Sequence, residues 1–284
     1  MKFDVDGVTI TALSAGESAP GRPMIAALHG GTYTARYFDV AGSGQGSFMD
    51  VASALGYRVV SFDRPGYGGS TALAPADNTF ARHAELLAPA IAQAAGDSPV
   101  VLVGHSIGGM IALMIAGTDP GFRLIGASVT GMGAVIRRGG AADALATLPP
   151  DETIDLPYDQ RDMVMFGPAG SFTADGVEQA HGSYAPTPVR ELIAAPQWAD
   201  DILPGLAPRI GVPVHNALAE FDALWDSTPE NVAQFAKMLT NAPFVDASIA
   251  RGTGHSIDHH VLGHALHLRQ LAFVEECAWR AGQG

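Results

Sequence analysis

The pentapeptide Gly104–Gly108 places one serine, Ser106, between two glycines in the pattern Gly-x-Ser-x-Gly. The apolar run Val100–Val103 precedes it with the character of a strand, and an apolar run of helical character follows it. A nucleophile on a sharp turn between strand and helix presents its hydroxyl clear of the backbone, and the glycines avoid clashes in so tight a turn. N–H groups at the start of the helix would face the developing negative charge. The pattern therefore predicts that Ser106 is a catalytic nucleophile.

A serine hydroxyl needs a general base, and ten histidines compete for that role. His255 stands out because it lies in a Gly-rich turn after the strand-like run Phe244–Ile249, where parallel sheets assemble their sites. The alternative is an unreactive histidine in a solvated loop. Carboxylate or Cys partners at metal-ligand spacing are missing from the histidines that follow, so we expect surface or packing roles for His259, His260, His264 and His267.

The base in turn needs a carboxylate that orients it. Asp222 directly follows the strand-like run Pro213–Leu218, and Glu220 and Asp226 are its local competitors. With Asp222, the residues stand in the chain order serine, acid, histidine that accompanies a Gly-x-Ser-x-Gly nucleophile. The sequence thus predicts a triad of Ser106, Asp222 and His255.

An oxyanion hole requires backbone N–H donors at fixed positions. One donor is expected from Ile107, the residue after the nucleophile. The other is expected from the loop after an early strand, where Gly30 and Gly31 allow close approach to a substrate. We assign this second donor to Gly31, with Thr32 as the nearest alternative. The other interpretation is a Gly-rich turn that has no catalytic role.

The elements that must position these residues follow an alternating pattern. Short apolar runs indicate buried parallel strands, and Ala-rich stretches between several of them have helical length, as at Phe80–Ala95 and Gly108–Gly117. Such βαβ units predict an α/β fold, a mostly parallel sheet flanked by helices. The opening stretch Phe3–Leu13 suggests antiparallel edge strands, and Gly263–Ala281 a final helix. The predicted parallel strands are Met24–Leu28, Arg58–Phe62, Val100–Val103, Leu124–Thr130 and Val212–Leu218.

Residues 134–207 interrupt this alternation with many prolines and glycines. We interpret them as a partly helical insertion that forms a lid, and residues 1–133 and 208–284 as the core. The lid would shape specificity, and inward-facing apolar residues in it would favour an apolar or aromatic group of the substrate. Its apolar and aromatic candidates are Met163, Val164, Met165, Phe166, Phe172, Tyr184 and Trp198.

Bulk properties exclude several classes of protein. The formal net charge is −13 and the basic residues are scattered, which argues against nucleic-acid partners and anionic membrane surfaces. The single cysteine, Cys277, excludes an intramolecular disulfide. No signal-peptide pattern or membrane-length apolar run is present, so a soluble cytoplasmic protein is expected. The oligomeric state has no signal in the sequence.

Together, these motifs resemble the α/β-hydrolase superfamily, whose order they keep over almost the whole chain outside the lid. The matching pieces are His29–Gly31, Asp63–Ser70, Gly104–Gly109, Glu220–Asp222 and Gly254–Ser256. The resemblance implies the family's fold and a serine hydrolase without metal or organic cofactor. It assigns Asp63–Ser70 to a structural turn.

The expected reaction is hydrolysis of a carboxylic ester, lactone or thioester of a small, apolar molecule through an acyl-enzyme. The alternatives are hydrolysis of a C–C bond, a lyase, cyclase or acyltransferase reaction at the same triad, and a ligand-binding receptor on the hydrolase scaffold. Thr32-Tyr33 departs from the bulky apolar residue often found after His-Gly, which could alter the pocket near the oxyanion hole. Substrate contacts are expected from His29, Thr32, Tyr33, His105, Met165 and Phe166.

Overall fold

The structure, a computed structural model, describes residues 1–283 apart from 43, 140–143 and 145–146. Its described residues form an eight-stranded sheet in the order β1-β2-β4-β3-β5-β6-β9-β10, and a small separate pair, β7-β8. β2 pairs antiparallel with both β1 and β4, and the other neighbours in the large sheet are parallel. The predicted mostly parallel sheet is confirmed. The strands are β1 (Lys2–Val5), β2 (Val8–Ala15), β3 (Met24–Leu28), β4 (Val59–Phe62), β5 (Val100–His105), β6 (Leu124–Thr130), β7 (Thr153–Ile154), β8 (Thr187–Pro188), β9 (Val214–Ala219) and β10 (Val245–Ala250).

The burial of each strand follows from its composition and its place in the sheet. Every residue of β3 and β5 is buried, because these apolar strands lie in the centre and are covered on both faces. In β1, exposed and buried residues alternate, as expected of an antiparallel edge strand with one wet face. The predicted antiparallel start of the chain is therefore confirmed.

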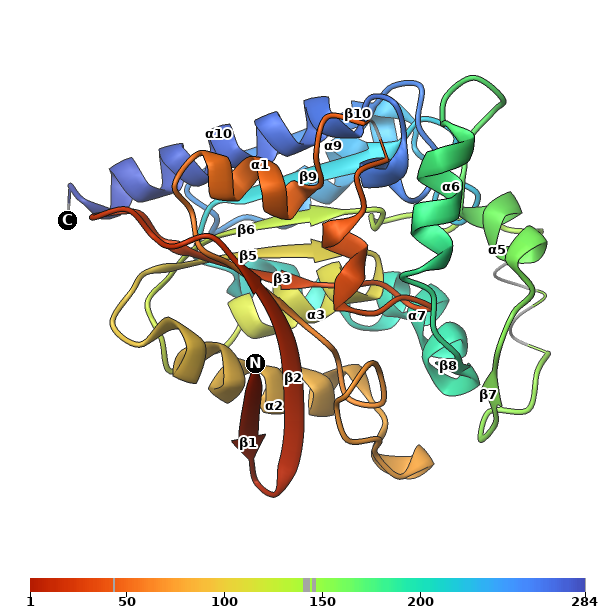
Figure 1. Ribbon diagram of the computed structural model, residues 1–284, viewed down its shortest axis with the longest axis horizontal. Helices are drawn as coiled ribbons and strands as arrows, with labels where there is room; N and C mark the ends of the chain where they lie inside the picture. The colour runs from red at the N-terminus through yellow and green to blue at the C-terminus, as the bar shows by residue number, and fades with distance from the viewer. Residues whose placement is uncertain (43, 140–143, 145–146, 284) are drawn as a thin grey trace.

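Helices cover both faces of the large sheet (Figure 1). Buried residues of α1 and α10 pack in one apolar cluster on one face, whereas those of α2, α3 and α9 belong to the cluster on the other. Helices α1 and α9 were not among the predicted elements. The helices are α1 (Phe48–Ala54), α2 (Phe80–Ala95), α3 (Ile107–Ala116), α5 (Tyr158–Met165), α6 (Ala174–His181), α7 (Val189–Asp201), α8 (Leu203–Leu206), α9 (Pro229–Met238) and α10 (Gly263–Ala281), with short 3-10 helices at Ala35–Asp39, Pro75–Asp77, Ala207–Arg209 and Ile257–His259.

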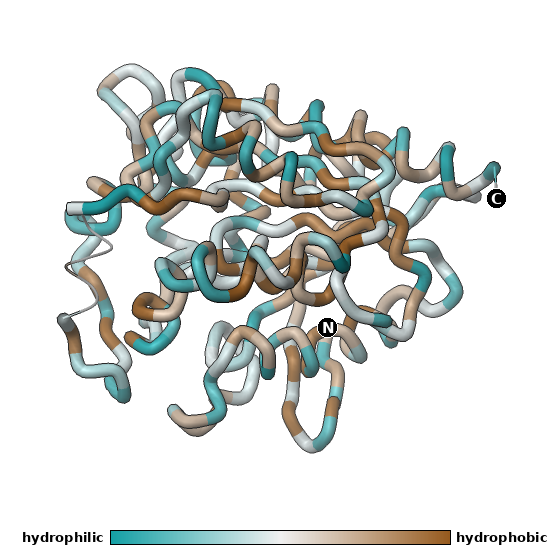
Figure 2. The backbone as a smooth tube through the Cα atoms, turned by 180° about the vertical axis from the view of Figure 1, so that it is seen from behind, coloured by the Kyte–Doolittle hydropathy of each residue, from teal (hydrophilic) through white to brown (hydrophobic). Residues whose placement is uncertain are grey.

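Helix α2 shows how local sequence sets these elements. Thr79 caps it by accepting a hydrogen bond from the Arg82 N–H, and it ends at Gly96, which has a φ of 55°. Figure 2 shows hydrophobic residues concentrated along the central strands, with hydrophilic residues recurring along the outer helices. Among the described residues, no helix is both long and apolar enough to cross a bilayer.

The described part of residues 134–207 lies between β6 and β9, which are neighbours in the sheet. It contains α5 to α8 and the short β7-β8 pair, and residues 140–143 and 145–146 of this range lie outside the described part. The segment leaves the sheet at the carboxyl end of β6, and Figure 1 shows α5, α6 and α7 gathered beyond that end of the strands. Helices of residues 134–207 therefore lie beyond the carboxyl ends of the parallel strands.

Two of the buried histidines, His215 and His83, show how the fold keeps such rings neutral. His215 on β9 bonds to the Ser128 hydroxyl at 2.8 Å, and burial lowers its pKa to about 4. His83 on α2 bonds to the Asn78 side chain at 2.6 Å, and burial likewise lowers its pKa to about 4. Protonating either ring in place would create a buried charge, so the fold favours the neutral rings.

We predict that acid destabilises the fold through these histidines. Because their folded pKa lies below the ordinary 6.5, their contribution to stability is fully present above pH 6.5 and is lost as the pH falls towards 4. Replacing His215 by Gln should remove up to about 3 kcal/mol of this pH dependence. Urea unfolding between pH 7.5 and 4 measures it. An unchanged pH dependence in the variant would contradict the assignment.

Candidate active site

Ser106 occupies the turn between β5 and α3 with a φ of 53° and a ψ of −121°. A Cβ atom at Gly104 would lie 2.6 Å from the Gly108 carbonyl oxygen, and one at Gly108 would collide with the carbonyl oxygen of Leu28. Both glycines are therefore required by the close approach of α3 to the neighbouring strands. The strained turn lifts the Ser106 side chain to the carboxyl edge of the sheet.

His255 and Asp222 reach Ser106 from loops after the neighbouring parallel strands β10 and β9. The Ser106 hydroxyl lies 3.1 Å from His255 Nε2, and His255 Nδ1 lies 3.0 and 3.1 Å from the two Asp222 oxygens. Nδ1 faces a carboxylate and so carries the proton, which leaves Nε2 to accept from the serine hydroxyl. The side chains are 8%, 1% and 0% exposed for Ser106, His255 and Asp222. The structure thus brings the predicted nucleophile, base and acid together.

Glu220, a competitor of Asp222, has a different partner. Glu220 is exposed, and its carboxylate accepts a hydrogen bond from the Gly252 N–H at 2.7 Å. Asp222 is fixed instead by the N–H groups of Leu224 and Trp225, which donate to Oδ1 at 2.9 and 3.0 Å. These bonds hold the carboxylate against His255.

The two predicted oxyanion donors lie on adjoining segments. Ile107 is the first residue of α3, so its N–H has no acceptor within the helix. A Cβ atom at Gly30 would lie 3.1 Å from Ser106 Cβ, and one at Gly31 would lie 3.0 Å from Ile107 Cδ1. The Gly30-Gly31 backbone therefore passes directly beside the nucleophile. A larger residue at either position would push this backbone away from Ser106 and Ile107.

Thr32, next in this loop, adopts a φ of 64° although it is β-branched. It is 3% exposed, and its Oγ1 is without a hydrogen-bond partner in the part of the chain that is described. Its carbonyl accepts the Ala185 N–H from the inserted segment at 2.8 Å. Strain of about 1–3 kcal/mol and an unpaired buried hydroxyl are features typical of functional sites.

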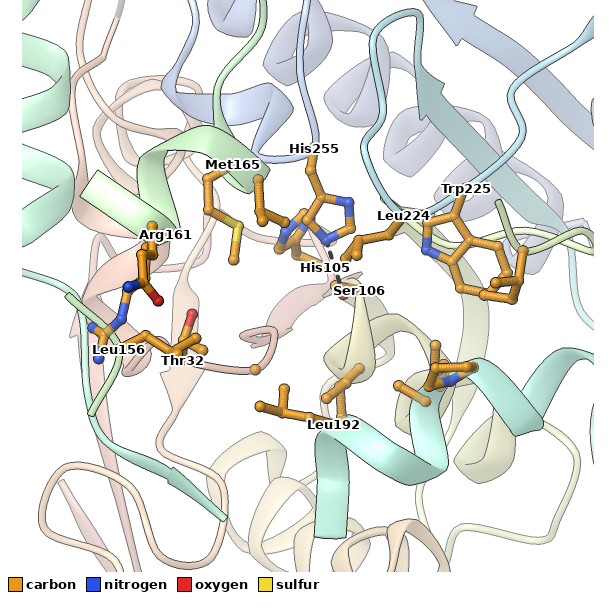
Figure 3. A pocket seen from close by; sticks show the side chains of 18 residues that line it. Thr32, His105, Ser106, Leu156, Arg161, Met165, Leu192, Leu224, Trp225 and His255 are labelled. Carbon is orange, nitrogen blue, oxygen red and sulfur yellow. Dashed lines mark hydrogen bonds between the residues drawn. The ribbon is translucent and has the colours of Figure 1, made fainter. Parts of the chain in front are cut away.

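A pocket that is partly open to solvent surrounds Ser106 and His255. Figure 3 shows the bond between His255 and Ser106 in the middle of the pocket, with Arg161 at one end and Trp225 at the other. The lining is mostly apolar, as suits an apolar substrate group. The lining residues are Gly31, Thr32, His105, Ser106, Ile107, Met110, Ile136, Leu156, Gln160, Arg161, Val164, Met165, Leu192, Ala195, Pro196, Leu224, Trp225 and His255.

Of the predicted substrate contacts, Thr32, His105 and Met165 line this pocket. Burial lowers the pKa of His105 well below its usual value, so its ring, centred 5.0 Å from that of His255, stays neutral. A neutral neighbour does not oppose protonation of His255. Among the apolar candidates of the insertion, Val164 also lines the pocket, whereas Met163 is exposed.

The structure places the remaining predicted contacts, His29, Tyr33 and Phe166, outside the pocket lining. The two ring nitrogens of His29 bond to the Gly30 carbonyl and the Arg64 N–H. The Tyr33 hydroxyl bonds to Ser256 Oγ at 2.7 Å, and Phe166 packs against Phe172 and His260. These side chains therefore support the loops of the site.

Several lining residues were missed by the sequence analysis, although some carried a signal. Gln160 and Arg161 recur at helical spacing on α5 with the candidates Val164 and Met165, and Leu192, Ala195 and Pro196 recur in the same way on α7. That spacing indicates one face of each helix but not which face meets the pocket.

The histidines after His255 pack inside the protein. His259, His260 and His267 are buried, so the packing role is the one observed, whereas His264 is partly buried. His260 Nε2 accepts the N–H groups of Gly167 and Gly254 at 3.0 and 2.8 Å, which fixes the loop just before His255. Among the described residues, no three His, Cys, Asp or Glu side chains gather in a group that could hold a metal ion.

No curated protein matches the chain, but many solved structures have a similar fold. An esterase from Thermogutta terrifontis aligns with a TM-score of 0.71 at 16% identity, over 98% of this chain and 97% of that one. The thioesterase domain of the curacin biosynthetic pathway gives 0.66 at 20% identity, over 95% and 98%. The N-acyl homoserine lactonase AidH gives 0.70 at 13% identity, over 98% and 96%. At these identities the likeness shows a shared fold.

The sequence also matches the Alpha/beta hydrolase family over residues 25–276. That range includes every loop described above, from Gly31 through Ser106 to Asp222 and His255. Family and structure agree on the α/β-hydrolase fold, as the motifs predicted. The chain belongs to the alpha/beta hydrolase family.

Proposed function

We propose that the protein is a serine hydrolase that cleaves a carboxylic ester, lactone or thioester of a small, mainly apolar molecule. The observation that carries this proposal is the continuous hydrogen-bonded arrangement of Ser106, His255 and Asp222 at 3.1 and 3.0 Å, which opens into an apolar pocket. The esterase, thioesterase and lactonase among the structural neighbours support the same class of bond.

In this mechanism, His255 Nε2 takes the proton of the Ser106 hydroxyl as its oxygen attacks the carbonyl carbon. Asp222 holds the imidazole and stabilises its cationic form. The N–H groups of Ile107 and Gly31 bind the oxyanion. His255 then gives the proton to the departing alcohol or thiol. A water molecule, deprotonated by the same ring, hydrolyses the acyl-enzyme and regenerates Ser106.

Residues 134–207 act as the lid in this proposal. Met165 and Val164 on α5 and Leu192 on α7 border the pocket, so the insertion supplies much of its apolar wall. Together with Trp225 from the core, they would select substrates by shape and apolar contact.

Replacing Ser106 by Ala should lower kcat on the order of a millionfold while leaving the protein folded, because only the nucleophilic oxygen is lost. Fluorophosphonate labelling and turnover of p-nitrophenyl esters of increasing chain length measure this. The wild-type protein should be labelled at Ser106 and turn over esters, and the variant should do neither. Labelling without turnover of esters, thioesters or lactones would favour non-hydrolytic chemistry. Full activity of the variant would refute the mechanism.

Replacing Asp222 by Asn should lower kcat by about 10⁴-fold, because the amide cannot hold His255 in the required tautomer or stabilise its cation. Glu220→Gln is the matched control, two residues away on the same loop, and should retain wild-type kcat. Steady-state kinetics with one p-nitrophenyl ester compare them. If the Glu220 variant lost activity instead, the acid would be assigned to the wrong residue.

A further inference from the structure

Arg64, in the turn after β4, is fully buried and contacts the backbone of the oxyanion loop. Its Nε donates to the His29 carbonyl at 3.0 Å, and its Nη2 donates to the Gly30 carbonyl at 3.1 Å. The Gly30 oxygen also lies 2.8 Å from His29 Nδ1. Because His29 Nε2 accepts the Arg64 N–H, Nδ1 carries the proton and donates to that oxygen.

These bonds determine the direction of the next N–H group. The described chain has no cis peptide bond, and in a trans peptide the N–H points opposite to the carbonyl of the same plane. Holding the Gly30 carbonyl towards Arg64 therefore turns the Gly31 N–H away from Arg64. Ser106 and Ile107 lie beside the two glycines: a Cβ atom at Gly30 would lie 3.1 Å from Ser106 Cβ, and one at Gly31 would lie 3.0 Å from Ile107 Cδ1.

Arg64 is itself held by Glu191, from the first turn of helix α7 in the inserted segment. Arg64 Nη1 lies 2.7 Å from Glu191 Oε2, and both side chains are 0% exposed. The Tyr67 hydroxyl donates to the same carboxylate at 3.0 Å, and Asn78 Nδ2 donates at 3.2 Å. Burial raises the pKa of Glu191, but the charges of Arg64 and His83 and the hydrogen bonds from Arg64 and Asn78 together outweigh burial. The pKa is therefore lowered, and the carboxylate is ionised at neutral pH.

The residue after Glu191 faces the pocket. Leu192 lines it, and its Cδ2 would lie 3.5 Å from a Cβ atom at Gly31. One turn of α7 thus touches the oxyanion loop twice, through Leu192 directly and through Glu191 by way of Arg64. A buried ion pair is weak evidence for stability, since apolar replacement of both partners is often neutral or stabilising. A role in positioning gives a reason for this pair to be kept.

We propose that Arg64 and Glu191 are positioning residues for the reaction: Arg64 orients the Gly31 N–H towards the oxyanion, and Glu191 couples that orientation to the seating of helix α7. This inference rests on the proposed hydrolase function. It makes the lid helix part of the machinery that stabilises the transition state as well as a wall of the pocket.

Replacing Arg64 by Lys tests the orientation. One ammonium group cannot reach two carbonyl oxygens and Glu191 in the geometry of the guanidinium fork. We expect kcat for p-nitrophenyl acetate to fall about 10- to 100-fold, less than the loss of an entire donor, with KM nearly unchanged. The inhibition constant of phenylboronic acid, whose tetrahedral adduct with Ser106 places an oxygen in the oxyanion hole, should rise by the same factor. Wild-type kcat with wild-type phenylboronic acid affinity would overturn the proposal.

Replacing Glu191 by Gln tests the coupling to α7, and Arg190→Gln is the matched control. Arg190 is the preceding residue on the same helix, and it pairs with Asp151 at the surface. The Glu191 variant should lower kcat and weaken phenylboronic acid binding, whereas the Arg190 variant should match the wild type. Equal behaviour of the two variants would overturn the coupling.

A single charge left in the interior could unfold the protein, so the double variant Arg64→Met, Glu191→Leu provides a second test. It removes both charges, and we expect it to fold, by thermal unfolding and circular dichroism, yet keep the low kcat and weak boronate binding. A folded double variant with wild-type kcat would show a purely structural role. Fluorophosphonate labelling of the wild type separates the two proposals. If the wild type is not labelled, both the proposed function and this inference are wrong. If the wild type is labelled and the Arg64 and Glu191 variants keep its kcat and its phenylboronic acid affinity, only this inference is wrong.

Discussion

The left-handed backbone of Ser106 is the constraint on which the rest of the site depends. It requires a turn in which α3 approaches the strands beside β5 so closely that Gly104 and Gly108 can carry no side chain. Here the buried strand β5 brings the chain to that turn at the carboxyl end of the parallel strands. The loops after β3, β9 and β10 end at the same edge, and they bring the donor, acid and base to one point.

Short stretches of the sequence were enough to predict several of the helices and the positions of Ser106, Asp222 and His255. Helices α2 and α10 begin and end at the predicted residues, because caps and apolar periodicity are written into contiguous stretches. The assignment of Ser106, Asp222 and His255 depended on which residues follow strands, and the structure brings those three together. Their catalytic roles remain predictions. Helices α1 and α9 were missed, although Ser47 and Thr228 cap them by accepting backbone N–H bonds.

Side-chain direction was less predictable because it depends on contacts between distant segments. Phe166 follows Met165 directly, yet only Met165 faces the pocket, since α5 ends between them. His29 looked available for substrate, but the backbone of Arg64 and Gly30 occupies both of its nitrogens. The sequence could not indicate the pairing of Arg64 with Glu191 either, because 127 residues separate them and each would be ordinary at the surface.

The buried pair of Arg64 and Glu191 has an evolutionary consequence. A lineage that replaced either residue first would pass through an intermediate with one uncompensated charge in the interior, so the two positions are expected to change together or not at all. Substitution of Leu192 or Ala195, on the same helix, leaves no buried charge unpaired, so these two residues can change one at a time as the pocket adapts to new substrates. The sequence of the insertion would therefore vary around the conserved ion pair that attaches it to the core.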